Sequence, residues 1–231
     1  CTFMFIYAVF MNLSYKLQKR KLEKFPQVIN PDYKPFVTVM IPAHNEEGVI
    51  GATVQNILNM DYENFEVIVI DDRSSDNTAS VIKDLEQKYE KVTALIRPKD
   101  AFPGKSAVLN DALKLAKGEA ILVFDADATV DPDFLSKLIP NLEPKDVGAV
   151  QARKVIRNKN TNLLTRCQNN EYTMDAHLQL GRDSIKGAVE LRGNGELIKR
   201  EALEDIGGWN NYTLVDDLDM STRLHIKGWD V

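Results

Sequence analysis

The sequence predicts an α/β protein whose mainly parallel sheet is doubly wound, with helices on both faces. Between residues 36 and 153, short runs rich in β-branched residues alternate with helical segments of about 10 to 14 residues. This alternation is typical of βαβ crossovers. The length of 231 residues fits one large α/β domain or at most two small ones. A hydrophobic fraction of 44% with only 12 Gly and 9 Pro excludes disordered, collagen-like and low-complexity chains.

The folded domain is expected to begin at residue 36, because Pro31 and Pro35 interrupt regular structure just before it. Runs of apolar and β-branched residues predict five strands. They are residues 36–41, 65–70, 92–97, 120–124 and 147–153. Pro42 is expected to end the first strand, since proline has no N–H to donate to a ladder.

Apolar residues at helical spacing predict one helix after each of the first four strands. The first covers residues 47–60. The second is capped by Ser75 or Asp76 and carries the apolar residues Ala79, Val81, Ile82 and Leu85. The third covers residues 105–117 before Gly118, and the fourth is capped by Asp131 with Pro132 in its first turn. After the fifth strand the pattern changes. The sequence there predicts a long helix at 160–181, a glycine-rich segment at 187–200, a short helix at 201–206, a loop at 207–209 and a last helix at 216–227.

The first 13 residues are nearly all apolar and uncharged, and the strongly basic segment 14–24 follows them directly. A membrane-spanning helix needs about 20 residues. The run is therefore interpreted as a signal peptide, a buried amphipathic helix or the end of a membrane-spanning helix. A signal peptide places its basic residues before the apolar run, unlike this segment. Basic residues after the run favour the third interpretation, with the following domain on the cytoplasmic side. We expect residues 1–35 to be the end of a membrane helix and a basic linker.

The net charge and the cysteine content argue against several classes of function. The chain has 29 Lys and Arg residues against 34 Asp and Glu residues, so its net charge is −5. This balance argues against a protein whose main partner is a nucleic-acid backbone, because such a protein needs clustered Lys and Arg in excess. The two cysteines, Cys1 and Cys167, provide neither a disulfide framework nor a four-ligand zinc site of the usual spacing. A reducing compartment is expected.

In an open parallel sheet, ligands bind beyond the carboxyl ends of the strands. Polar and acidic residues gather in the loops after the first, second and fourth strands. These loops carry His44, Asn45, Glu46 and Glu47, then Asp71, Asp72 and Asp76, and finally Asp125 and Asp127. Carboxylates this close together raise one another's pKa and destabilise the fold unless a cation or ligand offsets them. Taken singly, Asp71, Asp76 and Asp131 also suit turns or helix caps.

Asp125 and Asp127 are separated by one residue at the end of a strand. If the chain bends there, one carboxylate can bind a divalent ion while the other reaches a neighbouring ligand group. Mg²⁺ and Mn²⁺ prefer one or two carboxylates together with phosphate oxygens and waters. The pair therefore suggests a metal site that holds a diphosphate, although the same spacing is common in ordinary loops.

Three further residues have two interpretations each. Asp216 and Asp217 open the last predicted helix, where an acid either interacts favourably with the helix dipole or serves as a general base for an acceptor hydroxyl. Lys105 opens the third helix and is either a solvated lysine or a group that approaches a phosphate.

Four segments carry the most specific pattern of the chain. They are VTVMIPAHNEE at 37–47, VIVIDDRSSDNT at 67–78, PGKSAVLNDALKLAKGEAILVFDADATVDPDFL at 103–135 and VDDLDMSTRLHIKGWDV at 215–231. In this order they resemble the family 2 inverting glycosyltransferases, which have the nucleotide-sugar-binding fold called GT-A. The likeness extends over nearly all of residues 36–231. It is greatest to the membrane-bound polysaccharide synthases, which include cellulose, chitin, hyaluronan and poly-N-acetylglucosamine synthases.

The resemblance implies that residues 192–200 contain a glycine-bearing strand and a basic pair on the acceptor side. It also implies a role for each candidate residue. Pro42, His44 and Glu46 would border the nucleotide, and Asp72 would hydrogen-bond its base. Lys105 and Asp125 would lie at the donor, and Asp127 would bind Mg²⁺ or Mn²⁺. Asn194 and Asp216 would lie on the acceptor side, and Asp217 would be the catalytic base. The family's Thr-Glu-Asp motif reads Val215-Asp216-Asp217 here, so the base is retained while the two preceding positions differ. The Gln-x-x-Arg-Trp motif of processive members does not occur before Val231. A catalytic domain at 36–231 that is truncated at its C-terminus is therefore expected.

The activity that the resemblance implies is metal-dependent, inverting transfer of a hexose from a nucleotide-diphosphate sugar to a saccharide or lipid acceptor. The donor is expected to be UDP-linked, with UDP-glucose and UDP-N-acetylglucosamine as first candidates, and the setting to be cell-envelope or extracellular polysaccharide synthesis. A nucleotidyltransferase is an alternative, but it usually has a glycine-rich basic loop where this chain has IPAHNEE. A phospho-acceptor receiver domain leaves the second half unexplained. A domain that binds nucleotide sugars without turnover uses the same loops and stays open.

Overall fold

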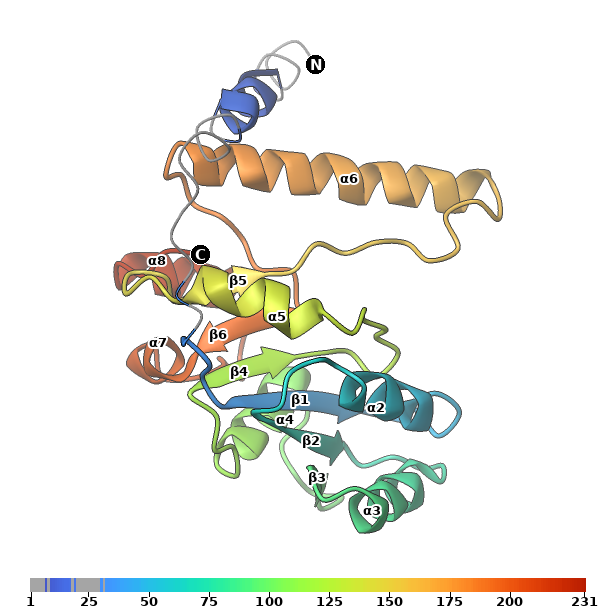
Figure 1. Cartoon of the computed structure of the whole chain (residues 1–231). Coiled ribbons are helices and arrows are strands. Elements are labelled where there is room, and N and C mark those ends of the chain that lie inside the picture. The colour runs from blue at the N-terminus through green and yellow to red at the C-terminus, as the bar shows by residue number, and fades with distance from the viewer. Residues whose placement is uncertain (1–6, 8, 18, 20–29, 31) are drawn as a thin grey trace.

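The computed structural model describes residues 7, 9–17, 19, 30 and 32–231. Its centre is a six-stranded sheet in the order β3-β2-β1-β4-β6-β5 (Figure 1). The strands are β1 (Val37–Ala43), β2 (Phe65–Asp71), β3 (Val92–Ile96), β4 (Ala120–Val123), β5 (Ala149–Gln151) and β6 (Glu196–Lys199). The pairs β1–β2, β1–β4 and β2–β3 are parallel, whereas β6 is antiparallel to both β4 and β5. The predicted α/β class with a mainly parallel sheet is confirmed.

Helices cover both faces of this sheet. They are α2 (Ile50–Leu58), α3 (Thr78–Lys88), α4 (Lys105–Leu113), α5 (Phe134–Leu138), the 3₁₀ helix η1 (Ile139–Leu142), α6 (Leu163–Ser184), α7 (Arg200–Asp205) and α8 (Asp216–Ile226). Alternate residues of β1 point into two apolar clusters: Val39 joins α2 and α3, while Met40 joins α4, α7 and α8. Because both faces are buried, the central strands are continuous apolar runs rather than alternating ones.

The strand β6 lies in the segment that its composition marked only as glycine-rich. It has four residues, and both of its ends are charged, so its sequence shows no strand period. Gly193 and Gly195 precede it with φ values of 73° and 75°, a region that favours glycine. The resemblance had implied a strand here. Its position between β4 and β5 brings the segment 192–195 to the end of β4.

The prediction that Pro42 ends the first strand is wrong, because β1 continues to Ala43. The Ala43 carbonyl accepts the Asp72 N–H on the β2 side, whereas the Met40 carbonyl accepts the Phe124 N–H on the β4 side. Since the backbone N–H and C=O groups of successive strand residues alternate in direction, the Pro42 nitrogen, which carries no hydrogen, points toward β4. There the ladder has already ended at the pair Met40–Val123. The missing N–H therefore costs no ladder bond.

The predicted helix cap at Asp131 is also wrong, because α5 begins only at Phe134. The Asp131 carbonyl accepts the Phe134 N–H, and the Pro132 carbonyl accepts the Asp61 N–H, so this segment forms a turn bound to the loop before β2. The prediction that Ser75 or Asp76 caps the next helix is wrong by one or two residues, because α3 begins at Thr78 with Asn77 as its N-cap, but Asp76 does bind the first residue of the helix. Its Oδ1 accepts the N–H of Thr78 at 3.0 Å and the Thr78 hydroxyl at 2.6 Å.

Gly118, which follows α4 and its terminal turn, lies too close to the central sheet for a larger residue to replace it. A Cβ atom on Gly118 would lie 2.4 Å from the Thr38 nitrogen and 2.6 Å from the Ala120 carbonyl oxygen. Both neighbours are backbone atoms of the central sheet, so they cannot move aside cheaply. We expect Gly118→Ala to lower the free energy of unfolding by about 3 kcal/mol, measured by urea denaturation. Gly51→Ala is the matched control, since no atom lies within 4 Å of its added Cβ.

An N-terminal helix, described at residues 7, 9–17 and 19, packs on the C-terminal part of α6 (Figure 1). Met11 lies against Gly181, where an added Cβ would be 2.5 Å from the Met11 Cβ. The Tyr15 and His177 rings meet edge to face with centroids 6.0 Å apart. Residues 1–6 and 8 of the predicted membrane segment lie outside the described residues, as do residues 18, 20–29 and 31 of the basic segment and linker. Within the described part of the chain, no helix combines the length and apolar character needed to cross a membrane.

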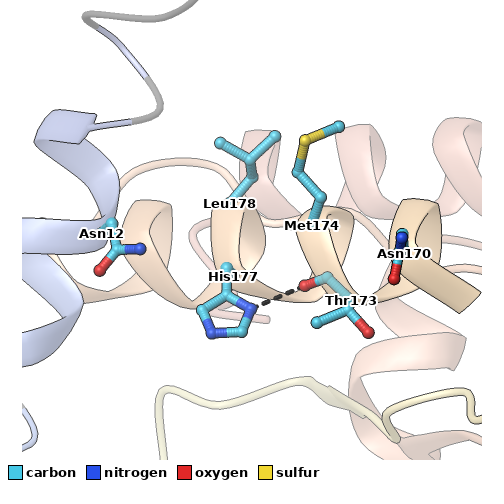
Figure 2. A pocket seen from close by; sticks show the side chains of 6 residues that line it. All are labelled: Asn12, Asn170, Thr173, Met174, His177 and Leu178. Atoms are coloured by element: carbon cyan, nitrogen blue, oxygen red, sulfur yellow. Dashed lines mark hydrogen bonds between the residues drawn. The ribbon is translucent and has the colours of Figure 1, made fainter.

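A pocket of about 340 Å³ lies between this helix and α6. Figure 2 shows its lining, which consists of Asn12, Asn170, Thr173, Met174, His177 and Leu178. The His177 Nδ1 lies 2.7 Å from the Thr173 carbonyl of the preceding turn. None of the residues expected to bind the donor, the metal or the acceptor lines this pocket.

Candidate active site

The loops after β1 and β2 lie side by side at the carboxyl ends of the parallel strands and are joined by hydrogen bonds. The His44 Nδ1 lies 2.7 Å from the Asp72 carbonyl oxygen. The Asn45 N–H donates to the Ser74 hydroxyl at 2.9 Å, and the Asn45 side-chain oxygen accepts the Ser75 N–H at 2.8 Å. Asn45 has a φ of 58°, a conformation that asparagine adopts more readily than most residues. The exposed His44 ring is therefore held beside Asp72, as expected of two groups that border one ligand.

Asp72 is held as an anion by two arginines. Its Oδ1 accepts from Arg73 Nε at 2.8 Å and from Arg97 Nη1 at 2.6 Å, and its Oδ2 accepts from Arg73 Nη2 at 3.0 Å. Burial acts to raise the pKa of Asp72, but the hydrogen bonds from Arg73 and Arg97 outweigh it and leave the pKa below its usual value. The carboxylate is thus ionised at neutral pH and can accept a hydrogen bond from an N–H of a base.

Arg97 lies beside Asp72 at the candidate site and was not singled out by the sequence pattern. Its side chain is 2% exposed, and besides Asp72 it binds the Asp111 carboxylate and the Phe102 carbonyl. It therefore joins the β2 edge to the loop that leads into α4 and Lys105. The only signal in the sequence was an arginine at the carboxyl end of a predicted strand, where a ligand edge was expected.

The other two residues expected at the nucleotide have different surroundings. Pro42 is half-buried within β1. The N–H of Glu46 donates to the Thr78 hydroxyl at 2.8 Å, which fixes the backbone of the first loop against the start of α3.

A second group of residues gathers around the end of β4. The Lys105 ammonium lies 2.6 Å from Asp125 Oδ1 and donates to the Gly193 carbonyl at 2.9 Å. The Asp125 N–H donates to the Asn194 side-chain oxygen at 3.3 Å. Lys105 is therefore not simply a solvated side chain, because it connects α4, β4 and the segment before β6. Three of the residues predicted from the sequence, Lys105, Asp125 and Asn194, meet here.

Asp127 is exposed and lies two residues beyond Asp125. Within the described part of the chain, its carboxylate has no hydrogen bond or ion pair, and no three His, Cys, Asp or Glu residues gather as a ready metal site. A single accessible carboxylate fits Mg²⁺ or Mn²⁺ in sites where diphosphate oxygens and waters supply the other ligands. The residues present are therefore compatible with a metal that binds together with a diphosphate, and Asp127 is the one that would hold it.

The acidic start of α8 faces this second group. Asp216 and Asp217 both lie in the first turn of the helix, where the helix dipole favours them. Asp217 Oδ1 accepts the Leu218 N–H at 2.9 Å, whereas its Oδ2 is directed at Gly193, only 3.5 Å from where a Cβ would stand. This position is compatible with both interpretations of Asp217, as an acid favoured by the helix dipole and as a general base.

The segment 191–195 lies next to Asp217 and is held by the side chains of Ser221, Gln151 and Glu196. The Ser221 hydroxyl donates to the Asp217 carbonyl at 2.6 Å and accepts the Leu191 N–H at 2.8 Å. The Gln151 side chain accepts the Arg192 N–H at 2.6 Å and donates to the Asn194 carbonyl at 2.9 Å. Gln151 was not predicted, since a glutamine at the end of a short strand carries no recognisable signal.

Glu196 is the third group that holds this segment, and it was not predicted either. Its side chain accepts the Gly193 N–H at 2.6 Å, and the residue is only 3% exposed. Burial raises the pKa of Glu196 to about 7, although the Gly193 N–H and the charge of Lys105 act in the opposite direction.

The titration of Glu196 gives a prediction for stability. Because its pKa is higher in the folded chain than the ordinary value of 4.5, the contribution to stability is complete below about pH 4.5 and is lost as the pH rises through about 7. We expect this loss to be on the order of 3 kcal/mol. Glu196→Gln should abolish it, so that urea midpoints of the variant change much less than those of the wild type between pH 5 and pH 8. Equal changes in both proteins would contradict the prediction.

Comparison with known proteins identifies the family of the chain. Residues 34–231 match the protein family described as glycosyltransferase like family 2. The chain is 44% identical over 199 residues to a protein of Trichormus variabilis named β-monoglucosyldiacylglycerol synthase, and the match covers 85% of this chain and 42% of that protein. It is 30% identical over 242 residues to a poly-β-1,6-N-acetyl-D-glucosamine synthase of Staphylococcus aureus, with coverage of 99% and 57%.

A solved structure shows the same fold. A mannosyltransferase from Pyrobaculum calidifontis, determined in complex with GDP-Man and Mn²⁺, matches with a TM-score of 0.75 and 27% identity over 96% of this chain and 62% of that one. The chain spans about half the length of its curated relatives, 42% of one and 57% of another. Since the family match covers residues 34–231 and the sheet has the same architecture, the chain belongs to glycosyltransferase family 2 and has the GT-A fold.

Proposed function

We propose that this chain is the catalytic part of a metal-dependent, inverting glycosyltransferase that moves a hexose from a UDP-linked donor to a lipid or saccharide acceptor. One observation carries the proposal. The candidate base Asp217 and the candidate donor ligand Lys105, which is paired with Asp125, both lie next to Gly193: Lys105 donates to the Gly193 carbonyl, and Asp217 Oδ2 is 3.5 Å from where a Cβ on Gly193 would stand. A hydroxyl group and a sugar diphosphate bound at this edge would be brought together.

The reaction that this arrangement supports is a single displacement. Asp217 accepts the proton of the acceptor hydroxyl, and the oxygen attacks the anomeric carbon from the face opposite the leaving group. The bond from the anomeric carbon to the diphosphate oxygen breaks, and the nucleoside diphosphate leaves with the electron pair. No covalent sugar intermediate forms, so the site needs no separate nucleophile.

The remaining residues bind and orient the donor in this proposal. Asp72, kept ionised by Arg73 and Arg97, accepts a hydrogen bond from the base, and the first loop with Pro42, His44 and Glu46 borders the nucleotide. Lys105 lies where its charge offsets that of the diphosphate. A Mg²⁺ or Mn²⁺ ion held by Asp127 would supply further charge stabilisation to the leaving diphosphate. Asn194 and Asp216 lie on the side of the acceptor.

Glucose and a diacylglycerol acceptor are the first choice of substrates, because the relative at 44% identity is named β-monoglucosyldiacylglycerol synthase. A lipid acceptor also agrees with the proposed membrane helix and basic linker within residues 1–35, which would place the domain on the cytoplasmic membrane face. A growing polysaccharide made from UDP-N-acetylglucosamine is the second choice, since the relative at 30% identity is named for such a polymer.

The test is turnover by the full-length protein in detergent or membranes. A panel of UDP- and GDP-linked sugars is offered with diacylglycerol or with an oligosaccharide, and the release of nucleoside diphosphate and the product are measured. Release that depends on both donor and acceptor, with inversion at the anomeric carbon, is expected. Donor binding without release from any pair would instead favour a nucleotide-sugar-binding domain without turnover.

A further inference from the structure

Glu196 is a buried acid next to the proposed site that the proposed reaction does not use. It is the first residue of β6 and pairs with Val123, the last residue of β4. Asp125 therefore lies two residues beyond Val123, the β4 residue that pairs with Glu196. The Glu196 Oε1 accepts the Gly193 N–H at 2.6 Å, which closes the turn from residue 193 to residue 196.

Gly193 is fixed on two other sides. Its carbonyl accepts from the Lys105 ammonium, which also binds Asp125 at 2.6 Å. Its α-carbon faces Asp217, whose Oδ2 lies 3.5 Å from the position of an added Cβ. Gly193 is thus next to both the proposed base and Lys105, and Glu196 is the side chain that holds its N–H.

We propose that Glu196 is a positioning residue for the transfer reaction: by binding the Gly193 N–H, it sets the distance between the Asp217 carboxylate and the Lys105–Asp125 pair. The inference rests on the transferase function proposed above. Nothing in this role requires Glu196 to touch the donor or the acceptor, because it acts through the backbone of Gly193. Misplacement of reacting groups by about 1 Å can cost about a hundredfold in rate.

The charge of Glu196 adds a second effect. The charged groups that face it are Lys105 from α4, Asp217 from α8 and Lys154 from the segment after β5. With a pKa of about 7, Glu196 is neutral in mildly acidic solution and charged in mildly basic solution. The charged form strengthens the bond to the Gly193 N–H, and its repulsion favours proton uptake by Asp217. Transfer is therefore expected to become faster as Glu196 ionises.

The test compares kcat and the donor KM of the full-length protein between pH 6 and pH 8 for the wild type and two variants. Glu196→Ala removes the acceptor of the Gly193 N–H and should lower kcat by about ten- to a hundredfold, with the donor KM changed less than about threefold. Glu196→Gln keeps an oxygen for that N–H but cannot ionise. It should retain the wild-type kcat at pH 6 within about threefold and lose the rise, about three- to tenfold, that the wild type shows through pH 7.

Glu66→Gln is the matched control. Glu66 is also buried and accepts a backbone N–H, that of Lys117, at 2.8 Å, but it lies near the start of β2, at the opposite end of the strands. It should keep the wild-type pH profile. If the wild type turns over and Glu196→Gln shows the same rise in kcat, the inference is overturned while the proposed function stands. This outcome is decisive even if Glu196→Ala does not fold. A wild-type protein that releases no nucleoside diphosphate from any donor overturns the proposed function and the inference together.

Discussion

Replacing Asp217 with Asn is expected to lower the kcat of sugar transfer by about 10²- to 10⁴-fold while donor affinity stays within about twofold. The amide has nearly the shape of the carboxylate and keeps an oxygen for the Leu218 N–H, so the first turn of α8 remains intact. It cannot take a proton from an acceptor hydroxyl. The measurement is steady-state transfer by the full-length protein, together with calorimetric titration of the nucleoside diphosphate.

Asp219→Asn separates catalysis from a helix-dipole effect. Asp219 lies in the same first turn, but its carboxylate binds Arg223 at 2.7 Å within α8 and does not face Gly193. If the acids of this turn only interact with the helix dipole, both variants should lose about 0.3–1 kcal/mol of stability and little activity. Transfer by Asp217→Asn at more than a tenth of the wild-type rate would refute the assignment of the base.

The sequence predicted which residues share one edge of the sheet, because parallel strands impose that arrangement. Residues that follow β1, β2 and β4 must lie at one edge of the sheet, and His44, Asp72 and Asp125 therefore share that edge without any information about side chains. The pairing of side chains was not predictable in the same way. Asp72 and Arg97 are 25 residues apart, and their contact at 2.6 Å depends on the placement of β3 beside β2.

Where the residue pattern alone failed to predict an element correctly, tertiary contacts outweighed the local preference of the sequence. β6 is stabilised by ladders to both β4 and β5, so it forms although its four residues begin with a glutamate and end with a lysine. The Asp131–Pro132 pair has the composition of a helix start, but the bond from the Asp61 N–H to the Pro132 carbonyl holds it in a turn. Glu196 was not predicted for the same reason as β6. A charged residue at the end of a short strand has the pattern that is typical of a loop.

Replacing Asp127 with Ala is expected to remove the stimulation of nucleoside diphosphate binding by Mn²⁺ or Mg²⁺, about a hundredfold in affinity. At the edge where we propose that the diphosphate binds, Lys105 is already paired with Asp125, so without a metal ion the repulsion between carboxylates and phosphates is poorly offset. The wild type should bind UDP much more tightly with Mn²⁺ than with a chelator. In the variant the two affinities should be nearly equal, as measured by calorimetric titration.

Asp131→Ala distinguishes a specific metal ligand from a general loss of negative charge. Asp131 is an exposed acid four residues further on, and in the described structure it is its carbonyl, not its carboxylate, that forms a hydrogen bond. Both variants remove one negative charge from the same loop. If charge alone mattered, both would strengthen metal-free binding slightly and leave the metal effect in place. Only a direct ligand role predicts that Asp127→Ala loses the metal effect while Asp131→Ala keeps it, so a metal effect retained in Asp127→Ala would place the ion on other ligands.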